Sequence, residues 1–216
     1  EEAVFLERID VFDGHCDTVS RRCEEGGGFW ENSGHLDLRR TRKFGRYAQF
    51  FAIFGDTDEM TAPPWELCRR QYALFQRELR LNAGYMTHCR TAAQAEQAFA
   101  QGKTAAFLSV EGAELLDCNL DKLGWAREAG VRAINLTWNH ANALSGSIAE
   151  DERRGLSARG REFVWRMEEL GILVDVSHLS EPGFWDVAAI AKKPFFASHS
   201  NARTVFSAPR SLTDEQ

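Results

Sequence analysis

The sequence predicts an α/β fold built on a parallel sheet, and three observations carry this prediction. Apolar runs alternate along the chain with helical segments, the order typical of strand–helix units. The runs are continuously apolar rather than alternating, as in strands covered on both faces. Four runs end in potential metal ligands, and the strand ends of a (β/α)8 TIM barrel converge on one face. In an open, doubly wound sheet the ends of these strands would instead spread along a line, so we predict the barrel.

Six segments have the apolar and β-branched composition of buried strands. In chain order they are residues 9–12, 48–54, 104–110, 131–137, 172–176 and 194–197. The first lies at the end of an apolar run that begins at Val4. No glycine-rich GxGxxG loop follows this strand, which removes the main dinucleotide-binding interpretation.

Five helices are predicted between the strands from helical spacing of apolar residues and from capping residues. They are residues 68–79, 91–100, 120–129, 157–170 and 180–190. Thr91 with Gln94 forms a capping box, and Gly130 is a typical helix-ending residue. Residues 21–46 are rich in Gly and Arg, and we predict a long loop there that is most flexible at residues 26–28.

Composition limits the classes of function. The 216 residues include 26 basic and 32 acidic ones, so the net charge is −6, which argues against a nucleic-acid partner. No run of about 18 apolar residues exists, so we expect no membrane span. Five scattered cysteines without a CxxC pair indicate a reducing compartment, and we predict a cytoplasmic protein with one domain over residues 1–216. Because the chain begins with Glu, a removed leader is compatible with the sequence.

Five potential metal ligands lie at the ends of predicted strands. They are His15 and Asp17 after the first strand, Glu111 after the third, His178 after the fifth and His199 after the sixth. A strand has a period of two, so His15 and Asp17 should project to one side and Cys16 to the other. The sequence therefore predicts a metal centre shared by distant parts of the chain.

The number of ligands predicts two metal ions. A catalytic zinc with an open position takes three protein ligands, whereas five suit two ions about 3.5–4 Å apart with a bridging carboxylate. Glu111 is the predicted bridge, because its strand lies between those of the other ligands. Imidazole with carboxylate selects Zn²⁺ most readily, with Mn²⁺ or Co²⁺ as substitutes.

The other three histidines receive separate predictions. His88 lies in a polar connection and is expected at the surface. His35 precedes any strand end and is expected to be structural rather than catalytic. His140 follows the fourth strand on the site face, where a substrate contact and a purely structural role both stay open.

Several separated motifs resemble those of the zinc dipeptidases of the membrane (renal) dipeptidase type, peptidase family M19. The motifs are Asp13-Gly14-His15-Cys16-Asp17, Ala48-Gln49-Phe50-Phe51, Glu111-Gly112, Leu136-Thr137, Val174-Asp175-Val176-Ser177-His178, Ser198-His199-Ser200-Asn201-Ala202-Arg203 and Pro209-Arg210. The resemblance covers nearly the whole chain. It implies a (β/α)8 barrel of the metal-dependent hydrolase type with a binuclear zinc centre, and a homodimer is compatible with it.

The resemblance also assigns roles to residues. His15 and Asp17 would bind the first zinc, Glu111 would bridge, and His178 and His199 would bind the second. Arg210 aligns with the arginine that binds the substrate carboxylate, a use suited to a planar bidentate donor.

The chain departs from the family pattern at two positions. Mammalian members place a substrate-binding His directly after Leu-Thr, where this chain has Trp138, and His140 is the candidate to substitute for it. Cys16 stands where members often have Asn, and we expect it to affect packing rather than ligation.

The predicted barrel is incomplete. A full barrel takes about 250 residues and eight strands, against six predicted here. Thr213 with Gln216 forms another capping box at the end of the sequence. We therefore expect truncation after about six βα units, with the acid/base Asp of the family lying beyond Gln216.

The predicted function is hydrolysis of dipeptides by a water that bridges two zinc ions. Two alternatives stay open. One is another metal-dependent amidohydrolase acting on a cyclic amide, lactone or β-lactam, although its usual first-strand signature is His-x-His rather than His-x-Asp. The other is an inactive barrel fragment with exposed strand edges.

Overall fold

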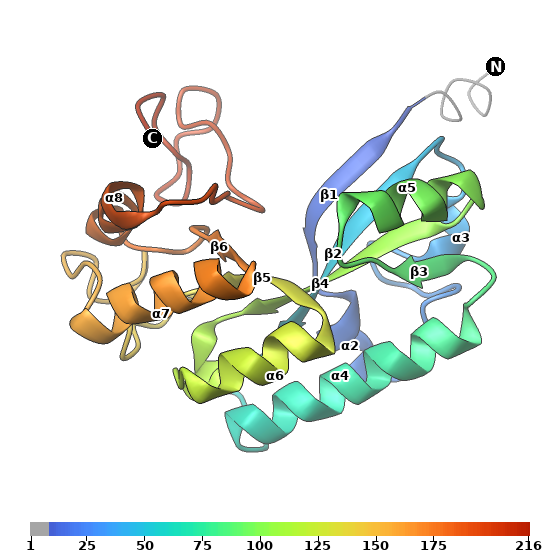
Figure 1. Ribbon diagram of the computed structural model, residues 1–216, viewed down its shortest axis with the longest axis horizontal. Helices are drawn as coiled ribbons and strands as arrows, with labels where there is room; N and C mark the ends of the chain where they lie inside the picture. The colour runs from blue at the N-terminus through green and yellow to red at the C-terminus, as the bar shows by residue number, and fades with distance from the viewer. Residues whose placement is uncertain (1–8) are drawn as a thin grey trace.

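One parallel sheet organises the chain in the computed structural model, which describes residues 9–216 (Figure 1). Within these residues the strands are β1 (Val11–Cys16), β2 (Tyr47–Phe54), β3 (Met86–His88), β4 (Thr104–Glu111), β5 (Val131–Asn135) and β6 (Leu173–Asp175). The strand order is β1-β2-β4-β5-β6, and β3 also pairs with β4. Every pair is parallel, which confirms the predicted α/β class.

Strand β4 lies at the centre of this sheet. One of its edges pairs with β2 from Ala105 to Glu111. The other edge is shared, because β3 pairs with the first residues of β4 and β5 pairs from Leu108 onward. In the sheet order β4, which ends at Glu111, lies between β1, which contains His15, and β6, which His178 follows.

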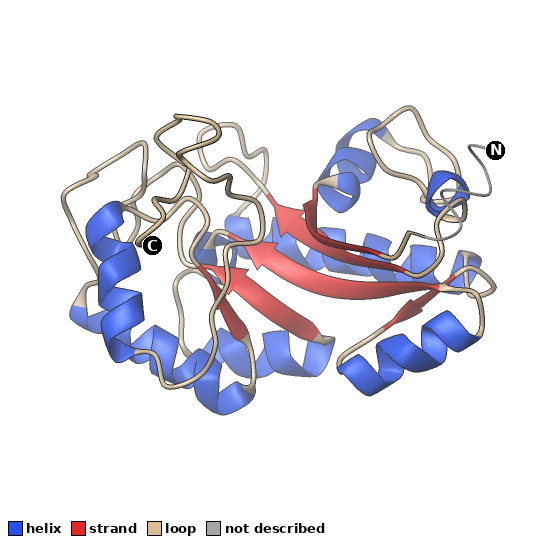
Figure 2. Ribbon diagram, turned by 90° about the horizontal axis from the view of Figure 1, so that it is seen from above, coloured by secondary structure: helices blue, strands red, loops and turns tan. Residues whose placement is uncertain are grey.

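Helices lie on both faces of the sheet (Figures 1 and 2). In chain order they are α2 (Thr18–Glu25), α3 (Leu38–Thr41), α4 (Pro64–Leu81), α5 (Ala92–Ala100), the 3-10 turn η1 (Ala113–Leu116), α6 (Asp121–Ala129), α7 (Ala158–Leu170) and α8 (Glu181–Ile190). Ala95 and Ala98 of α5 pack on the face that carries Phe107, and the other helices contribute to the core around Phe51. Among residues 9–216, no helix combines the length and apolarity needed to cross a membrane.

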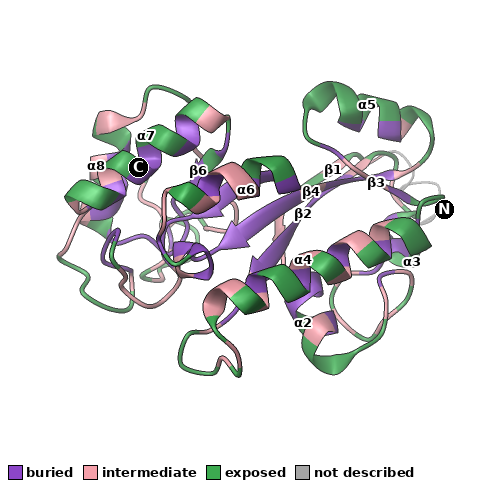
Figure 3. Cartoon of the chain, turned by 60° about the horizontal axis from the view of Figure 1, so that its bottom comes forward, coloured by how far each residue is buried: buried purple, intermediate pink, exposed green. Residues whose placement is uncertain are grey.

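Strands β2, β4 and β5 are buried on both faces, as their composition predicts (Figure 3). On the face toward α4, Phe51 of β2 packs against Phe29 and Phe75, with ring centroids 5.4 and 5.8 Å apart. Toward the opposite face, Phe50 packs against Phe107 of β4. Because consecutive residues of β2 enter different apolar layers, the strand cannot show an alternating pattern.

The sheet is strongly curled. Strands β1 and β6 stand four steps apart in the sheet order, which is about 19 Å in a flat sheet with strands about 4.8 Å apart. Yet the rings of His15 in β1 and His199 after β6 stack with centroids 4.0 Å apart. The backbones also approach closely, because a Cβ added to Gly14 would lie 2.4 Å from the carbonyl oxygen of Ser198.

Several predicted helix signals are confirmed. The hydroxyl oxygens of Thr91, Ser157 and Ser180 accept hydrogen bonds from backbone N–H groups in the first turns of α5, α7 and α8. Gly130 ends α6 with a φ of 91°. Thr213 and Gln216 exchange the two hydrogen bonds of a capping box.

Other predictions are corrected. Strand β1 extends to Cys16, so His15 lies inside the strand and Asp17 directly follows it. Residues 4–8 of the predicted run lie outside the described residues. The predicted loop 21–46 contains most of α2 and all of α3, the latter capped by Asp37. The predicted strand 194–197 is a single bridge between Phe196 and Asp175, and Pro194 lacks a backbone donor.

Candidate metal centre

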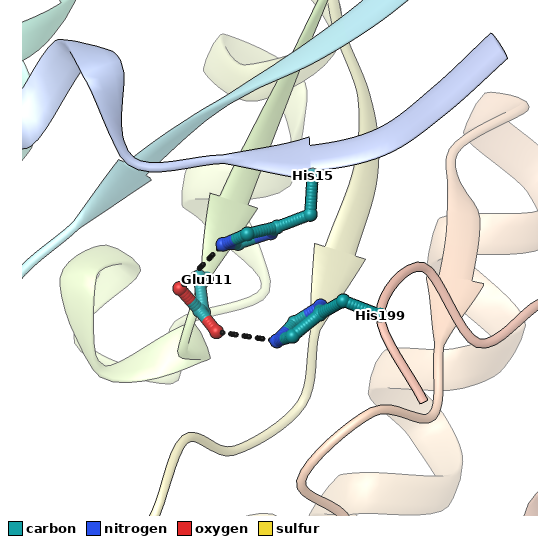
Figure 4. Close-up of side chains that lie close together, drawn as sticks. All are labelled: His15, Glu111 and His199. Carbon is teal, nitrogen blue, oxygen red and sulfur yellow. Dashed lines mark ion pairs between the residues drawn. The ribbon is translucent and has the colours of Figure 1, made fainter. Parts of the chain in front are cut away.

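Three imidazoles meet one buried carboxylate at the carboxyl ends of the strands. Glu111 is 4% exposed, and its Oε2 lies 3.2 Å from Nε2 of His15. Its Oε1 lies 3.0 Å from Nε2 of His178 and 3.2 Å from Nε2 of His199. His15 and His199 lie side by side and approach Glu111 from the same side, with their rings stacked 4.0 Å apart (Figure 4). The curl of the sheet brings these four side chains together.

Asp17 joins the cluster from the solvent side. Its Oδ1 lies 3.2 Å from Nε2 of His15, and the side chain is 49% exposed. Asp17 also precedes the first turn of α2, where its backbone oxygen accepts a hydrogen bond from the Ser20 hydroxyl. All five predicted ligands therefore lie in one cluster.

The charges in the cluster are strongly coupled. Burial disfavours the charge of Glu111, but the three imidazoles hold its pKa well below the ordinary value. Burial also lowers the pKa of His15, yet contacts with Asp17 and Glu111 outweigh it and raise that pKa to about 10. His178 faces one carboxylate and lies near Arg210, so burial prevails and lowers its pKa. The carboxylate at the centre is thus kept ionised.

The donor set fits divalent metal ions. His15, Glu111 and His199 offer ligand atoms within 4.8 Å of one another. Nε2 of His178 lies 2.9 Å from Nε2 of His199, and both face the same carboxylate oxygen. Imidazole nitrogen with carboxylate oxygen is the ligand combination that zinc binds most readily.

The outer nitrogens of two imidazoles have partners of their own. Nδ1 of His178 lies 2.9 Å from Oδ1 of Asn139, and Nδ1 of His199 lies 2.6 Å from Oγ of Ser198. A partner at Nδ1 fixes the orientation of a ligating ring. Neither Asn139 nor Ser198 was predicted as a site residue, although each directly precedes one, His140 and His199.

Arg210, the predicted substrate-binding residue, lies beside the centre. Its Nη2 donates a hydrogen bond of 3.2 Å to the carbonyl of His199. Its Nε is buried and has no hydrogen-bond partner within the described chain. With His199 and Asn139 it borders a cavity of about 470 Å³, and burial lowers its pKa.

His140 is surrounded by carboxylates rather than by the five ligands. Its Nε2 lies 3.1 Å from Asp56 and 3.6 Å from Asp58, and its Nδ1 lies 3.4 Å from Glu150. Burial lowers its pKa, but these acids outweigh burial and raise it overall. The Trp138 ring lies between this cluster and the centre, 5.6 Å from His140 and 6.0 Å from His178.

The remaining predicted positions differ in outcome. His88 is half-buried in β3, against the prediction of a surface residue, and its Nε2 lies 3.3 Å from the carbonyl oxygen of Gly130. The error follows from missing β3. His35 is exposed and borders a cavity of about 610 Å³ that also contacts His15. Cys16 packs against the hydrophobic core, as predicted.

The chain is similar to one known family and to known proteins. The model of the family described as membrane dipeptidase (peptidase family M19) matches residues 1–216. A protein of Acinetobacter calcoaceticus, described as an uncharacterized protein in the PQQ-III 3′ region, is 29% identical over 239 residues. That match covers 96% of this chain and 76% of the relative.

The fold of this chain is similar to those of solved metallopeptidase structures. A metallopeptidase of Rhodobacter sphaeroides, liganded with a phosphinate mimic of the dipeptide L-Ala-D-Ala, matches with a TM-score of 0.83 and 28% identity, over 96% of this chain and 70% of that one. The structure described as dipeptidase AC, of family M19, matches with a TM-score of 0.84 and 30% identity. That match covers 96% of this chain and 68% of the other.

Proposed function

Because the chain belongs to the membrane dipeptidase family, peptidase family M19, we propose that it is a metallo-dipeptidase with a binuclear zinc centre. The proposed ligands are His15 and Asp17 for one ion, His178 and His199 for the other, and Glu111 as the bridge. We infer that the curled parallel sheet is part of a (β/α)8 barrel, as the resemblance to this family implies and as the meeting of β1 with the segment after β6 supports.

The observation that carries the proposal is the arrangement around Glu111. Two oxygens of one carboxylate face different imidazoles, Oε2 toward His15 and Oε1 toward His178 and His199, at 3.0–3.2 Å. A carboxylate whose oxygens point to separate ligand groups is suited to bridge two cations. When bound, such ions lower the pKa of a coordinated water and polarise a carbonyl group.

The chain's own residues would bind and orient the substrate. The Arg210 guanidinium is proposed to hold the C-terminal carboxylate of the dipeptide, because its Nε lacks a partner within the described chain and its Nη2 lies at the centre's edge. We retain His140 as a candidate substrate contact on the same face. Both its ring nitrogens already face carboxylates, so this contact would require one partner to be exchanged. The acid/base Asp beyond Gln216 stays a prediction.

Zinc titration and a substrate panel test the proposal. Chelator-treated protein should bind about two zinc ions per chain, and Glu111→Gln should lower this number because it removes the bridging charge. In a protein that also carries the predicted acid/base Asp, dipeptides with L- and D-residues at the free carboxyl end should be hydrolysed with zinc and spared after chelation. Hydrolysis of lactones or cyclic amides without hydrolysis of dipeptides would overturn the dipeptidase assignment.

A further inference from the structure

We propose that Asn139 is a positioning residue that fixes the His178 imidazole as a metal ligand through its Nδ1 atom. This inference rests on the proposed metal centre. It concerns the loop after β5, residues 136–148, whose contacts hold both the ring and the backbone of His178.

The first argument is the proton position on the ring. A neutral imidazole carries one proton, and a ligating nitrogen must be free of it. The side-chain oxygen of Asn139 lies 2.9 Å from Nδ1 of His178 and accepts the proton there. Nε2, which faces Oε1 of Glu111 at 3.0 Å, is then left with its lone pair directed into the centre.

The second argument is the backbone of His178. Its φ is +69°, in the left-handed region that residues with a side chain rarely adopt. Such a conformation persists where surrounding contacts determine it. The carbonyl oxygen of His178 accepts hydrogen bonds from the backbone N–H of Ile148 at 2.9 Å and from the Thr137 hydroxyl at 3.4 Å. Both donors belong to the loop that carries Asn139.

The third argument is that this loop is itself held in place. The carbonyl of Asn139 accepts a hydrogen bond from the buried Ser147 hydroxyl. The next residue, His140, pairs with Asp56 beyond β2. The preceding ring of Trp138 packs 5.0 Å from Phe54. Asn139 is therefore restrained on both sides and offers a preorganised acceptor.

The hydrogen-bond partner of Nδ1 in His199 differs from the partner of Nδ1 in His178. Ser198 is the sequence neighbour of His199, and its hydroxyl can rotate to donate or accept. Asn139 lies 39 residues from His178 and presents its oxygen from another element. Replacing Asn139 should therefore weaken the binding of the ion held by His178 and His199. The binding of the ion held by His15 and Asp17 should stay nearly unchanged.

Two variants of similar size test the inference. Asn139→Asp keeps an oxygen acceptor, whereas Asn139→Leu removes it. Zinc affinity is measured by competition with a chelator, and the ligand field is read from the absorption spectrum of the cobalt-loaded protein. Asn139→Leu should weaken the binding of one zinc ion by about 10–100-fold and alter the absorption spectrum of the cobalt-loaded protein. Asn139→Asp should stay within a few-fold of the wild type.

Asn119→Leu serves as the matched control. The side-chain oxygen of Asn119 accepts a 3.0 Å hydrogen bond from the backbone N–H of Asp121 at the start of α6, and Asn119 is not among the residues of the cluster. This change should lower the melting temperature without changing zinc affinity. A loss of stability alone would therefore be distinguished from a loss of ligand orientation.

The outcomes separate the two proposals. Unchanged zinc affinity in Asn139→Leu, or an equal loss in Asn139→Asp, would overturn the role of Asn139 and leave the metal centre standing. A wild-type protein that binds no zinc would overturn both. If Asn139→Leu does not fold, NMR of the zinc-loaded wild type decides: a slowly exchanging Nδ1–H proton on His178 supports the inference, and its absence refutes it.

Discussion

Replacing Gly14 by alanine should disturb the metal centre and the fold together. The new Cβ would lie 2.4 Å from the carbonyl oxygen of Ser198, where real Cβ contacts stay above 3.0 Å. The two backbones must therefore separate by at least 3.0 − 2.4 = 0.6 Å. The backbone of Ser198 is restrained, because its N–H donates a 3.1 Å hydrogen bond to the buried Asp175 carboxylate.

The separation acts directly on two predicted ligands. Gly14 precedes His15 and Ser198 precedes His199, whose rings are stacked 4.0 Å apart. Metal sites tolerate ligand displacements of about 0.2 Å, so a shift three times larger should weaken zinc binding. Overpacking of this kind costs about 1–3 kcal/mol of unfolding free energy. For a chain of this size, each kcal/mol lowers the melting temperature by about 2–4 °C.

The assay combines thermal unfolding with zinc titration, and Gly124→Ala is the control. Gly124 lies inside α6, and a Cβ added there meets no atom of the described chain within 4 Å. That change should be neutral or stabilising by up to about 1 kcal/mol. A Gly14→Ala protein that melts and binds zinc like the wild type would refute the close contact between β1 and the segment after β6.

Three further predictions concern the core, the response to pH and the response to metal. Phe75→Ala removes a fully buried ring that packs against Phe29 and Phe51, and chemical denaturation should show a loss of about 3–5 kcal/mol. Burial, with help from Arg90, lowers the pKa of His88 from 6.5 to about 4. Between about pH 4 and pH 6.5 the unfolded chain therefore binds more protons than the folded one. The free energy of unfolding is full above about pH 6.5 and falls by about 3 kcal/mol toward pH 4. His88→Gln should flatten this part of the plot of stability against pH. Zinc at a hundredfold excess over its Kd should stabilise the protein by about 2.7 kcal/mol, and a melting temperature indifferent to zinc would count against the centre.

The sequence was sufficient for the parallel α/β class because both faces of strands such as β2 are covered, which produces unmistakable apolar runs. Gly130 and Gly171 end α6 and α7 with φ values of 91° and 66°, as glycine at such positions predicts. Short or polar elements were missed. Strand β3 has three residues, too few for a periodic signal, and α2 buries Arg22 and Thr18 beside Val19 instead of an apolar stripe.

The candidate site was predictable to the level of residue type and strand end. Placing His15 and Glu111 at one end of parallel strands required only the strand period and the direction of the chain, whereas His199 follows a single bridge rather than the predicted strand. The atoms that face one another depend on the curl of the sheet, which no local pattern encodes. The same holds for Asn139, whose contact with His178 depends on a loop conformation fixed by residues from other elements.

The close approach of β1 to the segment after β6 has a consequence for how the site is assembled. His15 and His199 are 199 − 15 = 184 residues apart in sequence, yet their rings touch. During synthesis from the N-terminus, His15, Asp17 and Glu111 emerge well before His178 and His199. The ligand set is therefore completed only after the first and last parts of the described sheet have met. Metal capture would then report that this long-range contact has formed, and a bound ion would cross-link the two ends of the sheet against reopening.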